Sequence, residues 1–161
     1  MDYKSKIILI AGPTASGKSK IAINLAKKIN GEIVNADSMQ VYKQLKILTA
    51  RPSEKDQKTI KHHLFGIIDV RRRFSTGQWL KECIKIINLI RKKKRIPIIV
   101  GGTGLYFKAL VDGLVSIPKF KPSEKNKILK LHKKLGQKQF YKKLVKLDPV
   151  SKKFINSNDV N

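Results

Sequence analysis

A glycine-rich loop constrains the fold of this chain more than any other feature. Residues 12 to 19 read GPTASGKS, which fits the pattern G-x-x-x-x-G-K-[ST]. In such a loop the backbone N–H groups surround phosphate oxygens, the lysine reaches the outer phosphates, and the last hydroxyl can ligate Mg²⁺. The loop therefore predicts a site for a diphosphate or triphosphate, with Ser19 as the Mg²⁺ ligand. The phosphate-binding residues are Gly12, Pro13, Thr14, Ala15, Ser16, Gly17, Lys18 and Ser19.

The segments around the loop predict an α/β fold of the P-loop type, an open parallel sheet flanked by helices. Apolar, β-branched runs that suit buried strands alternate with segments of helical periodicity. We expect only three or four strands, fewer than the five or six of an average sheet. The sheet is therefore expected to be incomplete, and the chain to be an N-terminal fragment. The predicted strands are residues 7–11, 32–35, 63–69 and 96–100, and the predicted helices include 17–29, a short one capped by Ser53 and Asp56, and 76–94.

The character of the sequence changes after Pro118. Residues 119–153 hold 13 lysines, no arginine and two acidic residues. Helical segments are expected up to a stop at Gly136, from there to Leu147, and again after the Asp148-Pro149 cap. We therefore expect two parts, an α/β core over residues 1–118 and a lysine-rich helical insertion over residues 119–161.

Composition narrows the class of protein. The 161 residues carry a formal charge of +25, which favours a polyanionic partner such as nucleic acid. Lysine supplies 30 of the 36 basic residues, a bias that an AT-rich genome also produces, so charge alone leaves nucleic-acid binding open. No apolar run approaches the roughly 20 residues of a membrane span, and the lone Cys83 suits a reducing compartment. We expect a soluble, cytoplasmic monomer that does not enter a membrane.

Asp37 is the first candidate catalytic residue. It follows the second predicted strand by two residues, so it lies at the carboxyl edge of the sheet beside the phosphate loop. Three roles are open for it: general base, holder of a hydrated Mg²⁺, or polar turn residue. After it, polar Ser38, Gln40 and Tyr42 alternate with apolar residues, as in an edge strand or in a row of side chains facing a base, and glutamine can read adenine through two hydrogen bonds.

Further polar residues have weaker signals. The Gly101-Gly102-Thr103 turn ends another strand, where two glycines permit close backbone approach and a hydroxyl faces the same edge. His62 and His63 have no third ligand nearby, and we interpret them as packing or capping residues. The triplet Arg71-Arg72-Arg73 is expected to pair with Asp69 at the surface. The basic run at residues 91–95 suits a solvated helix end or an RNA contact equally well.

Four segments together resemble the tRNA dimethylallyltransferase family, also called tRNA isopentenyltransferases. They are GPTASGKS at 12–19, NADSMQVY at 35–42 with TARP at 49–52, PIIVGGTGLYFKALVDGL at 97–114, and LDPVSKKFINSND at 147–159. The segments follow the family's order over nearly the whole chain. Leu48 stands where the family usually has glycine, and Arg51 replaces a usual lysine. Family members are about twice as long, in ordinary two-domain proportions.

The resemblance implies transfer of a dimethylallyl group from dimethylallyl diphosphate to the exocyclic amine of the adenine next to the anticodon in tRNA. Lys18, Ser19 and Mg²⁺ would then stabilise the leaving diphosphate. Asp37 matches the family's general base. Thr103, also expected to be catalytic, is similar to the family residue that faces both the diphosphate and a nucleotide flipped out of its stack. The lysine-rich insertion would grip the anticodon arm. The implied tRNA contacts are Asp37, Ser38, Met39, Gln40, Thr103, Asn158 and Asp159.

Other functions remain as alternatives. A small-molecule or nucleotide kinase has the same ATP-binding type of loop, but such kinases use arginine-bearing lids, and this chain has no arginine after Arg95. A nucleic-acid-binding module could use the nucleotide-binding loop only as a switch. A fragment that is inactive in isolation is also compatible with the resemblance.

Overall fold

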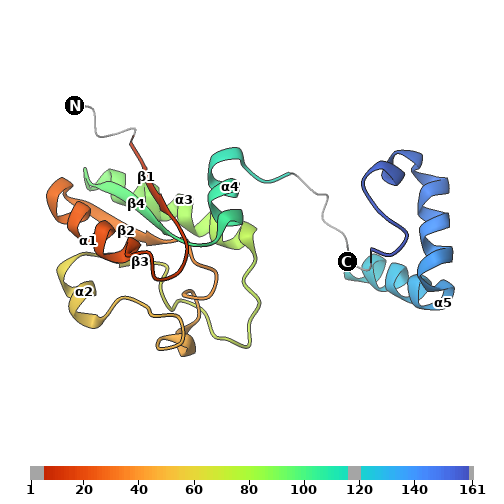
Figure 1. The fold of residues 1–161 in the computed structure, drawn as a ribbon, viewed down its shortest axis with the longest axis horizontal. Coiled ribbons are helices and arrows are strands. Elements are labelled where there is room, and N and C mark those ends of the chain that lie inside the picture. The colour runs from red at the N-terminus through yellow and green to blue at the C-terminus, as the bar shows by residue number, and fades with distance from the viewer. Residues whose placement is uncertain (1–5, 116–120, 160–161) are drawn as a thin grey trace. The chain divides into compact units, whose positions relative to one another are not determined.

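The computed structural model describes residues 6–115 and 121–159. They belong to two compact units, Met1–Val115 and Ser116–Asn161, which Figure 1 colours from red to blue along the chain. The first unit combines strands and helices, whereas the described part of the second contains helices alone. The boundary predicted at residue 118 falls among residues 116–120, outside the described residues.

The first unit is built on a parallel sheet of four strands in the order β1-β4-β2-β3 (Figure 1). Strands β2 and β4 lie in the centre and are buried at every residue, as their apolar, β-branched sequences predict. The parallel α/β architecture predicted from the sequence is therefore confirmed. The strands are β1 (Ile8–Ala11), β2 (Gly31–Asn35), β3 (His62–His63) and β4 (Ile96–Gly101).

Helices cover both faces of this sheet, because alternate residues of β2 and β4 point to opposite sides. Helix α1 (Lys18–Ile29) packs two buried alanines against Ile33, Ile98 and Val100. On the other face, Val34 and Ile99 belong to a second cluster. That cluster includes side chains of α3 (Thr76–Lys92) and α4 (Gly104–Asp112), with Trp79 stacked on Tyr106 at a ring-centroid distance of 4.2 Å.

Local capping signals placed several helix ends correctly. Helix α1 ends at Asn30 in the left-handed conformation, with φ 53°, and α2 (Glu54–Thr59) begins with the capping box of Ser53 and Asp56. Helix α3 stops two residues before the predicted end at Lys94, because Lys94 itself adopts a φ of 56°. A short 3₁₀ helix, η1 (Lys43–Leu45), follows the second strand.

The strand predicted over residues 63–69 is wrong beyond His63. Left-handed conformations at Leu64 and Gly66 break the extended backbone. The chain then turns alongside the segment that follows β2, where the N–H groups of Ile67 and Ile68 donate to the carbonyl of Val41 at 2.8 and 3.0 Å. The predicted third strand is therefore a two-residue strand followed by a loop held to residues 40–43.

The second unit consists of two consecutive helical elements. Helix α5 (Pro122–Leu147) has a non-helical residue at Gly136, with φ 72° and ψ 163°, where the sequence predicted a stop. A 3₁₀ helix, η2 (Pro149–Lys153), follows, capped by the Asp148 carboxylate that accepts from the N–H of Val150 at 3.1 Å. Among the described residues of both units, no helix combines the length and apolarity that a membrane span needs.

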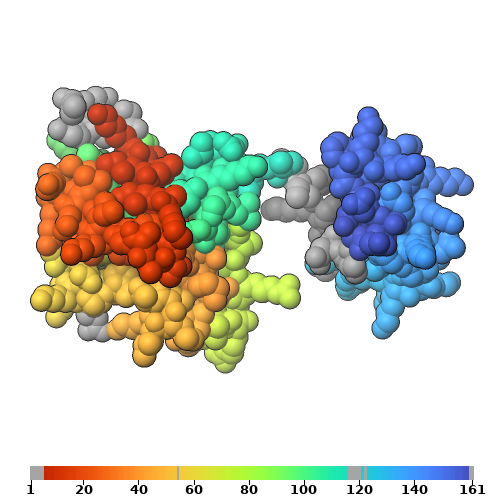
Figure 2. All heavy atoms as spheres, in the orientation of Figure 1, coloured from red at the N-terminus to blue at the C-terminus, as the bar shows by residue number. Residues whose placement is uncertain are grey.

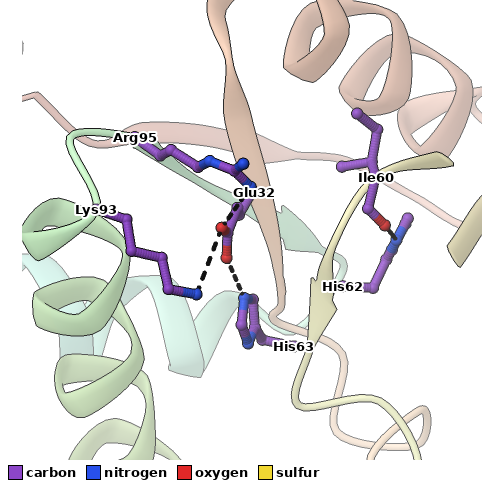
Figure 3. Close-up of polar contacts among 6 residues, drawn as sticks. All are labelled: Glu32, Ile60, His62, His63, Lys93 and Arg95. Atoms are coloured by element: carbon purple, nitrogen blue, oxygen red, sulfur yellow. Dashed lines mark hydrogen bonds and ion pairs between the residues drawn. The ribbon is translucent and has the colours of Figure 1, made fainter. Parts of the chain in front are cut away.

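A buried carboxylate anchors the amino end of β2. Glu32 is 1% exposed, and its side chain contacts three cationic or ionisable residues (Figure 3). Arg95 donates to Oε1 at 2.9 Å, Lys93 Nζ lies 3.7 Å from the same oxygen, and His63 Nε2 lies 2.6 Å from Oε2. Burial alone would raise the pKa of Glu32, but the hydrogen bonds from His63 and Arg95 and the charge of Lys93 hold it below its ordinary value.

The Glu32 contacts predict a pH-dependent stability. Because the folded-state pKa is lowered, the carboxylate stabilises the fold above its ordinary pKa of 4.5, and the contribution is lost as pH falls through the folded-state value. Glu32→Gln should lower the free energy of unfolding by about 2–3 kcal/mol at neutral pH. Thermal unfolding followed by fluorescence of Trp79, the chain's single tryptophan, measures this unit alone.

The matched control for this prediction is Glu82→Gln, since Glu82 forms an exposed pair with Lys85 at 2.7 Å. Such a pair contributes at most about 1 kcal/mol. An equal loss of stability for Glu32→Gln at pH 7 and at pH 3 would show that the charge of Glu32 is not what stabilises the strand.

Candidate active site

The phosphate loop connects β1 to α1 at the carboxyl edge of the sheet. Two of its residues, Ala15 and Gly17, adopt left-handed conformations with φ 65° and 80°. A Cβ atom on Gly12 would lie 3.3 Å from Ser16 Oγ, so the loop is packed closely around this glycine. Gly17 precedes the helix and has no side chain to cap it. The first N–H groups and the positive dipole end of α1 are therefore available to an anion.

Lys18 closes over the loop. Its Nζ donates to the carbonyl of Pro13 and lies 3.4 Å from Ser16 Oγ, and that hydroxyl also donates to Pro13 at 2.9 Å. The ammonium group thus lies above the turn of the loop. A bound phosphate would replace the Pro13 carbonyl as its partner, which is the contact that the sequence motif predicts.

The carboxylate of Asp37 is held in one orientation. Its Oδ1 accepts from the N–H of Met39 at 2.8 Å and from the N–H of Gln40 at 3.3 Å. No described residue donates to Oδ2, which lies 4.0 Å from the position of a Cβ on Gly102. One oxygen is therefore fixed by the backbone while the other is left to accept a proton or a hydrogen bond.

Gly101 and Gly102 bring the end of β4 against the residues that directly follow β2 and β1. A Cβ on Gly101 would lie 2.1 Å from the carbonyl oxygen of Ala36, and one on Gly102 would lie 3.3 Å from that of Gly12. The close approach places Thr103 beside Ser38. Thr103 Oγ1 accepts from the N–H of Ser38 at 2.9 Å and lies 3.3 Å from its hydroxyl. The structure thus brings the phosphate loop, Asp37 and Thr103 to one edge of the sheet.

An open cavity of about 710 Å³ lies over this edge. The phosphate loop, Asp37 and Gln40 line one part of it, and apolar side chains including Leu45 and Leu48 line another. Gln40 donates one N–H of its amide to the carbonyl of Thr49 at 2.8 Å, which leaves its Oε1 and its second amide N–H for a ligand. One donor and one acceptor are the pair that a glutamine uses to read adenine.

The remaining predicted site residues are divided between the two units. Residues 38–41 form turns, so the edge-strand interpretation of this segment is wrong, and Met39 is half-exposed on the cavity wall. Asn158 and Asp159 belong to the second unit. There Asp159 Oδ2 accepts from the N–H of Asn156 at 2.8 Å and closes a turn.

Two buried residues that support Asp37 were missed by the sequence analysis. Asn35 is fully buried, accepts from the N–H of Asp37 at 2.9 Å, and donates to the carbonyls of Asp37 and Leu64 at 3.0 and 3.1 Å. Trp79 donates from Nε1 to the carbonyl of Asn35 at 2.8 Å. A polar residue at the carboxyl end of a predicted buried strand was the available signal. Burial raises the pKa of the neighbouring Tyr106 to about 12, so it stays neutral.

The oxygen donors at this edge suit a hard divalent cation. Within residues 6–115 and 121–159, no group of three His, Cys, Asp or Glu residues could hold a metal ion by itself. The Ser19 hydroxyl follows Lys18 in the first turn of α1. Mg²⁺ commonly takes one or two protein oxygens and completes its shell with phosphate oxygens and water, so the site fits Mg²⁺ bound together with a phosphorylated ligand.

Comparisons with known proteins all lead to one family. The family model described as IPP transferase matches residues 40–161. The tRNA dimethylallyltransferase of Pelagibacter ubique (strain HTCC1062) is 63% identical over 99% of this chain and 51% of the relative. The enzyme of the same name from Rhizobium rhizogenes (strain K84) is 45% identical over 94% of the chain and 51% of the relative.

Two solved structures agree with the sequence comparisons. A eukaryotic dimethylallyltransferase acting on tRNA superposes with a TM-score of 0.81 and 34% identity, over 95% of this chain and 38% of that protein. The full-length tRNA isopentenylpyrophosphate transferase of Bacillus halodurans gives a TM-score of 0.68 and 33% identity, over 96% of this chain and 51% of that protein. The chain thus spans about half the length of the curated relatives it matches. On the family match and these two likenesses, the chain belongs to the IPP transferase family.

Proposed function

We propose that this chain takes part in tRNA modification, in the transfer of a dimethylallyl group from dimethylallyl diphosphate to the exocyclic amine of the adenine next to the anticodon. The observation that carries the proposal is the orientation of Asp37. Its Oδ1 is held by two backbone N–H groups, and its Oδ2 is left without a donor among the described residues, at the edge where the phosphate loop begins. A base and an anion site therefore share one cavity.

The reaction follows from these two parts. The adenine amine nitrogen bonds to the dimethylallyl carbon that carries the diphosphate. The bond between this carbon and the diphosphate oxygen breaks, and diphosphate leaves with the electron pair. The amine proton passes to Oδ2 of Asp37. The loop N–H groups and the Lys18 ammonium stabilise the negative charge that develops on the leaving group. Mg²⁺, held with Ser19, would neutralise part of the diphosphate charge.

The nucleotide would enter from the side of residues 38–40. An aromatic amine inside a stacked loop cannot reach Asp37, so the base must leave its stack. Met39 and Gln40 line the cavity, and we assign the contacts with the base to them together with Ser38 and Thr103, which bond to each other. We assign the lysine-rich unit, with Asn158 and Asp159, to the grip on the anticodon arm, because its described residues 121–159 hold 12 lysines and three acidic residues.

The comparisons support this proposal over the kinase alternative. The curated relatives reported above carry the name tRNA dimethylallyltransferase, and one of the solved relatives acts on tRNA. A kinase would release ADP from ATP in the presence of an acceptor, and that result would favour the alternative. A cytoplasmic monomer remains our expectation for the protein.

Removal of the Lys18 ammonium should weaken diphosphate binding. Lys18→Ala loses a charge-assisted hydrogen bond to phosphate, so the affinity for dimethylallyl diphosphate should fall about 10- to 150-fold by isothermal titration calorimetry. Lys27→Ala is the matched control, because Lys27 is an exposed lysine in the last turn of the same helix. Equal affinities for the two variants would contradict the phosphate-binding role of the loop.

Asp37→Asn should separate binding from chemistry. The amide oxygen of asparagine can still accept from Met39 and Gln40, so the cavity keeps its shape while the base is lost. We expect dimethylallyl diphosphate to bind within about threefold of the original affinity, and adduct formation to fall by about 10²–10⁴-fold. Adducts are measured by mass spectrometry of an RNA hairpin.

Because this chain spans half the length of its relatives, the transfer assay for Asp37→Asn uses a chimera that continues it with the remaining half of the Pelagibacter ubique relative. Asp112→Asn is the matched control, since it makes the same change at an exposed carboxylate at the end of α4 that does not line the cavity. Undiminished adduct formation by Asp37→Asn would overturn the general-base assignment.

A further inference from the structure

We propose that the turn bearing Arg72 and Arg73, with the neighbouring Lys43, is a docking surface for the phosphodiester backbone of RNA. We call these three residues the arginine-turn surface. The proposal rests on the proposed function for its choice of RNA as the partner. It adds a contact region in the first unit to the one already proposed for the lysine-rich second unit. The triplet was expected to pair with Asp69, and the structure shows that only one of its members does so.

Asp69 is fully engaged by its neighbours. Arg71 donates from Nε to Oδ1 at 2.9 Å and from Nη2 to Oδ2 at 3.2 Å, and Gln44 donates to Oδ2 at 2.8 Å. The hydrogen bonds from Arg71 hold the pKa of Asp69 at about 2, with a smaller effect from the charge of Lys43. Asp69 is therefore charged at neutral pH and neutralises Arg71 alone.

Arg72 and Arg73 are left with a surplus of positive charge. Both are exposed, and no residue in the described part of the chain pairs with either guanidinium. Lys43 is also exposed and lies close enough to Asp69 to influence its pKa. In Figure 2 the lime-coloured segment that includes this turn projects from the surface of the first unit. Three cations thus face solvent around one neutralised ion pair.

The use of arginine at this turn is informative in a lysine-rich chain. The sequence has 30 lysines and six arginines, and three of the six arginines are consecutive here. A bias toward lysine does not explain three consecutive arginines. Arginine presents a planar set of donors that binds a phosphate through two hydrogen bonds, which the point charge of lysine does not do.

The turn is held to the segment that carries the candidate site. The N–H of Lys43 donates to the carbonyl of Ile68 at 2.8 Å, and the N–H of Val70 donates to Oε1 of Gln44 at 3.0 Å. Tyr42 and Ile68 form a parallel bridge. Residues 42–44 directly continue the segment of Asp37 and Gln40, so the chain that leads into Arg72 and Arg73 is bonded to the same segment as the candidate base. Phosphates flanking a flipped nucleotide must lie outside the cavity, and contacts to them set its position.

Arginine-specific footprinting tests the proposal on the intact chain. Phenylglyoxal modifies arginine and does not modify the lysines of the second unit. The modified peptides are measured by mass spectrometry with and without an RNA hairpin. We expect RNA to protect Arg72 and Arg73 and to leave Arg95 unchanged, because Arg95 pairs with Glu32 at the amino end of β2. Equal modification of Arg72 and Arg73 with and without RNA would overturn the proposal. Protection by anionic phospholipid vesicles, with none by RNA, would also overturn it.

A salt titration supplies the second measurement. In Arg72→Gln/Arg73→Gln the slope of log affinity for the RNA hairpin against log salt should become shallower by about 1–2, since each lost phosphate contact removes about 0.7–1. The control Lys27→Gln/Lys28→Gln removes the same charge from exposed lysines at the end of α1 and should keep the original slope. Equal slopes for the two double variants would contradict the proposal.

Failure of this inference is distinguishable from failure of the proposed function. The Arg72→Gln/Arg73→Gln variant should bind dimethylallyl diphosphate with unchanged affinity, because neither arginine lines the cavity. Loss of diphosphate binding in Lys18→Ala, together with unprotected arginines, would leave the phosphate site standing and remove the RNA surface. Absence of any RNA binding by the unsubstituted chain would count against the surface.

Discussion

The geometry of the site depends on a contact between two backbones, where β4 ends against the residue that follows β2. The N–H of Ala36 donates to Val100 at 2.8 Å, and the N–H of Thr103 donates to Ala36 at 3.1 Å. No side chain could occupy position 101, since a Cβ there would lie 2.1 Å from the Ala36 carbonyl oxygen. This approach aligns Asp37, Thr103 and the start of the phosphate loop without any direct bond among their side chains. Backbone placement of this kind is more rigid than placement by long side chains.

Strand β2 is fixed at both ends by polar contacts of different kinds. At its amino end the buried Glu32 is held by His63, Arg95 and Lys93, and at its carboxyl end Asn35 is held by Leu64 and by the backbone of Asp37. Burial of a carboxylate and an amide is costly unless they are fully partnered. Each set includes a contact to β3 or to the residue that follows it, His63 for Glu32 and Leu64 for Asn35, so the base is positioned by a strand with little freedom to move.

The sequence predicted what local signals specify. The phosphate loop, the capping box at Ser53 and the break at Gly136 depend on residues close in sequence, and the structure has all three. The two-residue length of β3 could not be predicted, because the chain after it bonds to a segment distant in sequence. Gly66 turns the chain with φ 57°, and the N–H groups of Ile67 and Ile68 donate to the carbonyl of Val41. The Gln40 contact with Thr49 and the inward turn of Arg95 likewise come from tertiary packing, which residue type alone does not reveal.

Some basic residues of the first unit pair with acidic residues of the fold, and others have no such partner among the described residues and are left for recognition. Lys93 and Arg95, in the basic run that suited either interpretation, turn toward Glu32 and serve the fold. Asp69 neutralises Arg71 and at the same time accepts from Gln44, so it fixes the turn while leaving the next two arginines uncompensated. Exposed lysines attract polyanions through the net charge of the surface. To orient a bound RNA, cations must be held in a fixed position relative to the base. The segment from Asp37 to Gln44 is bonded to residues 66–70 and so holds the arginine-turn surface in such a position.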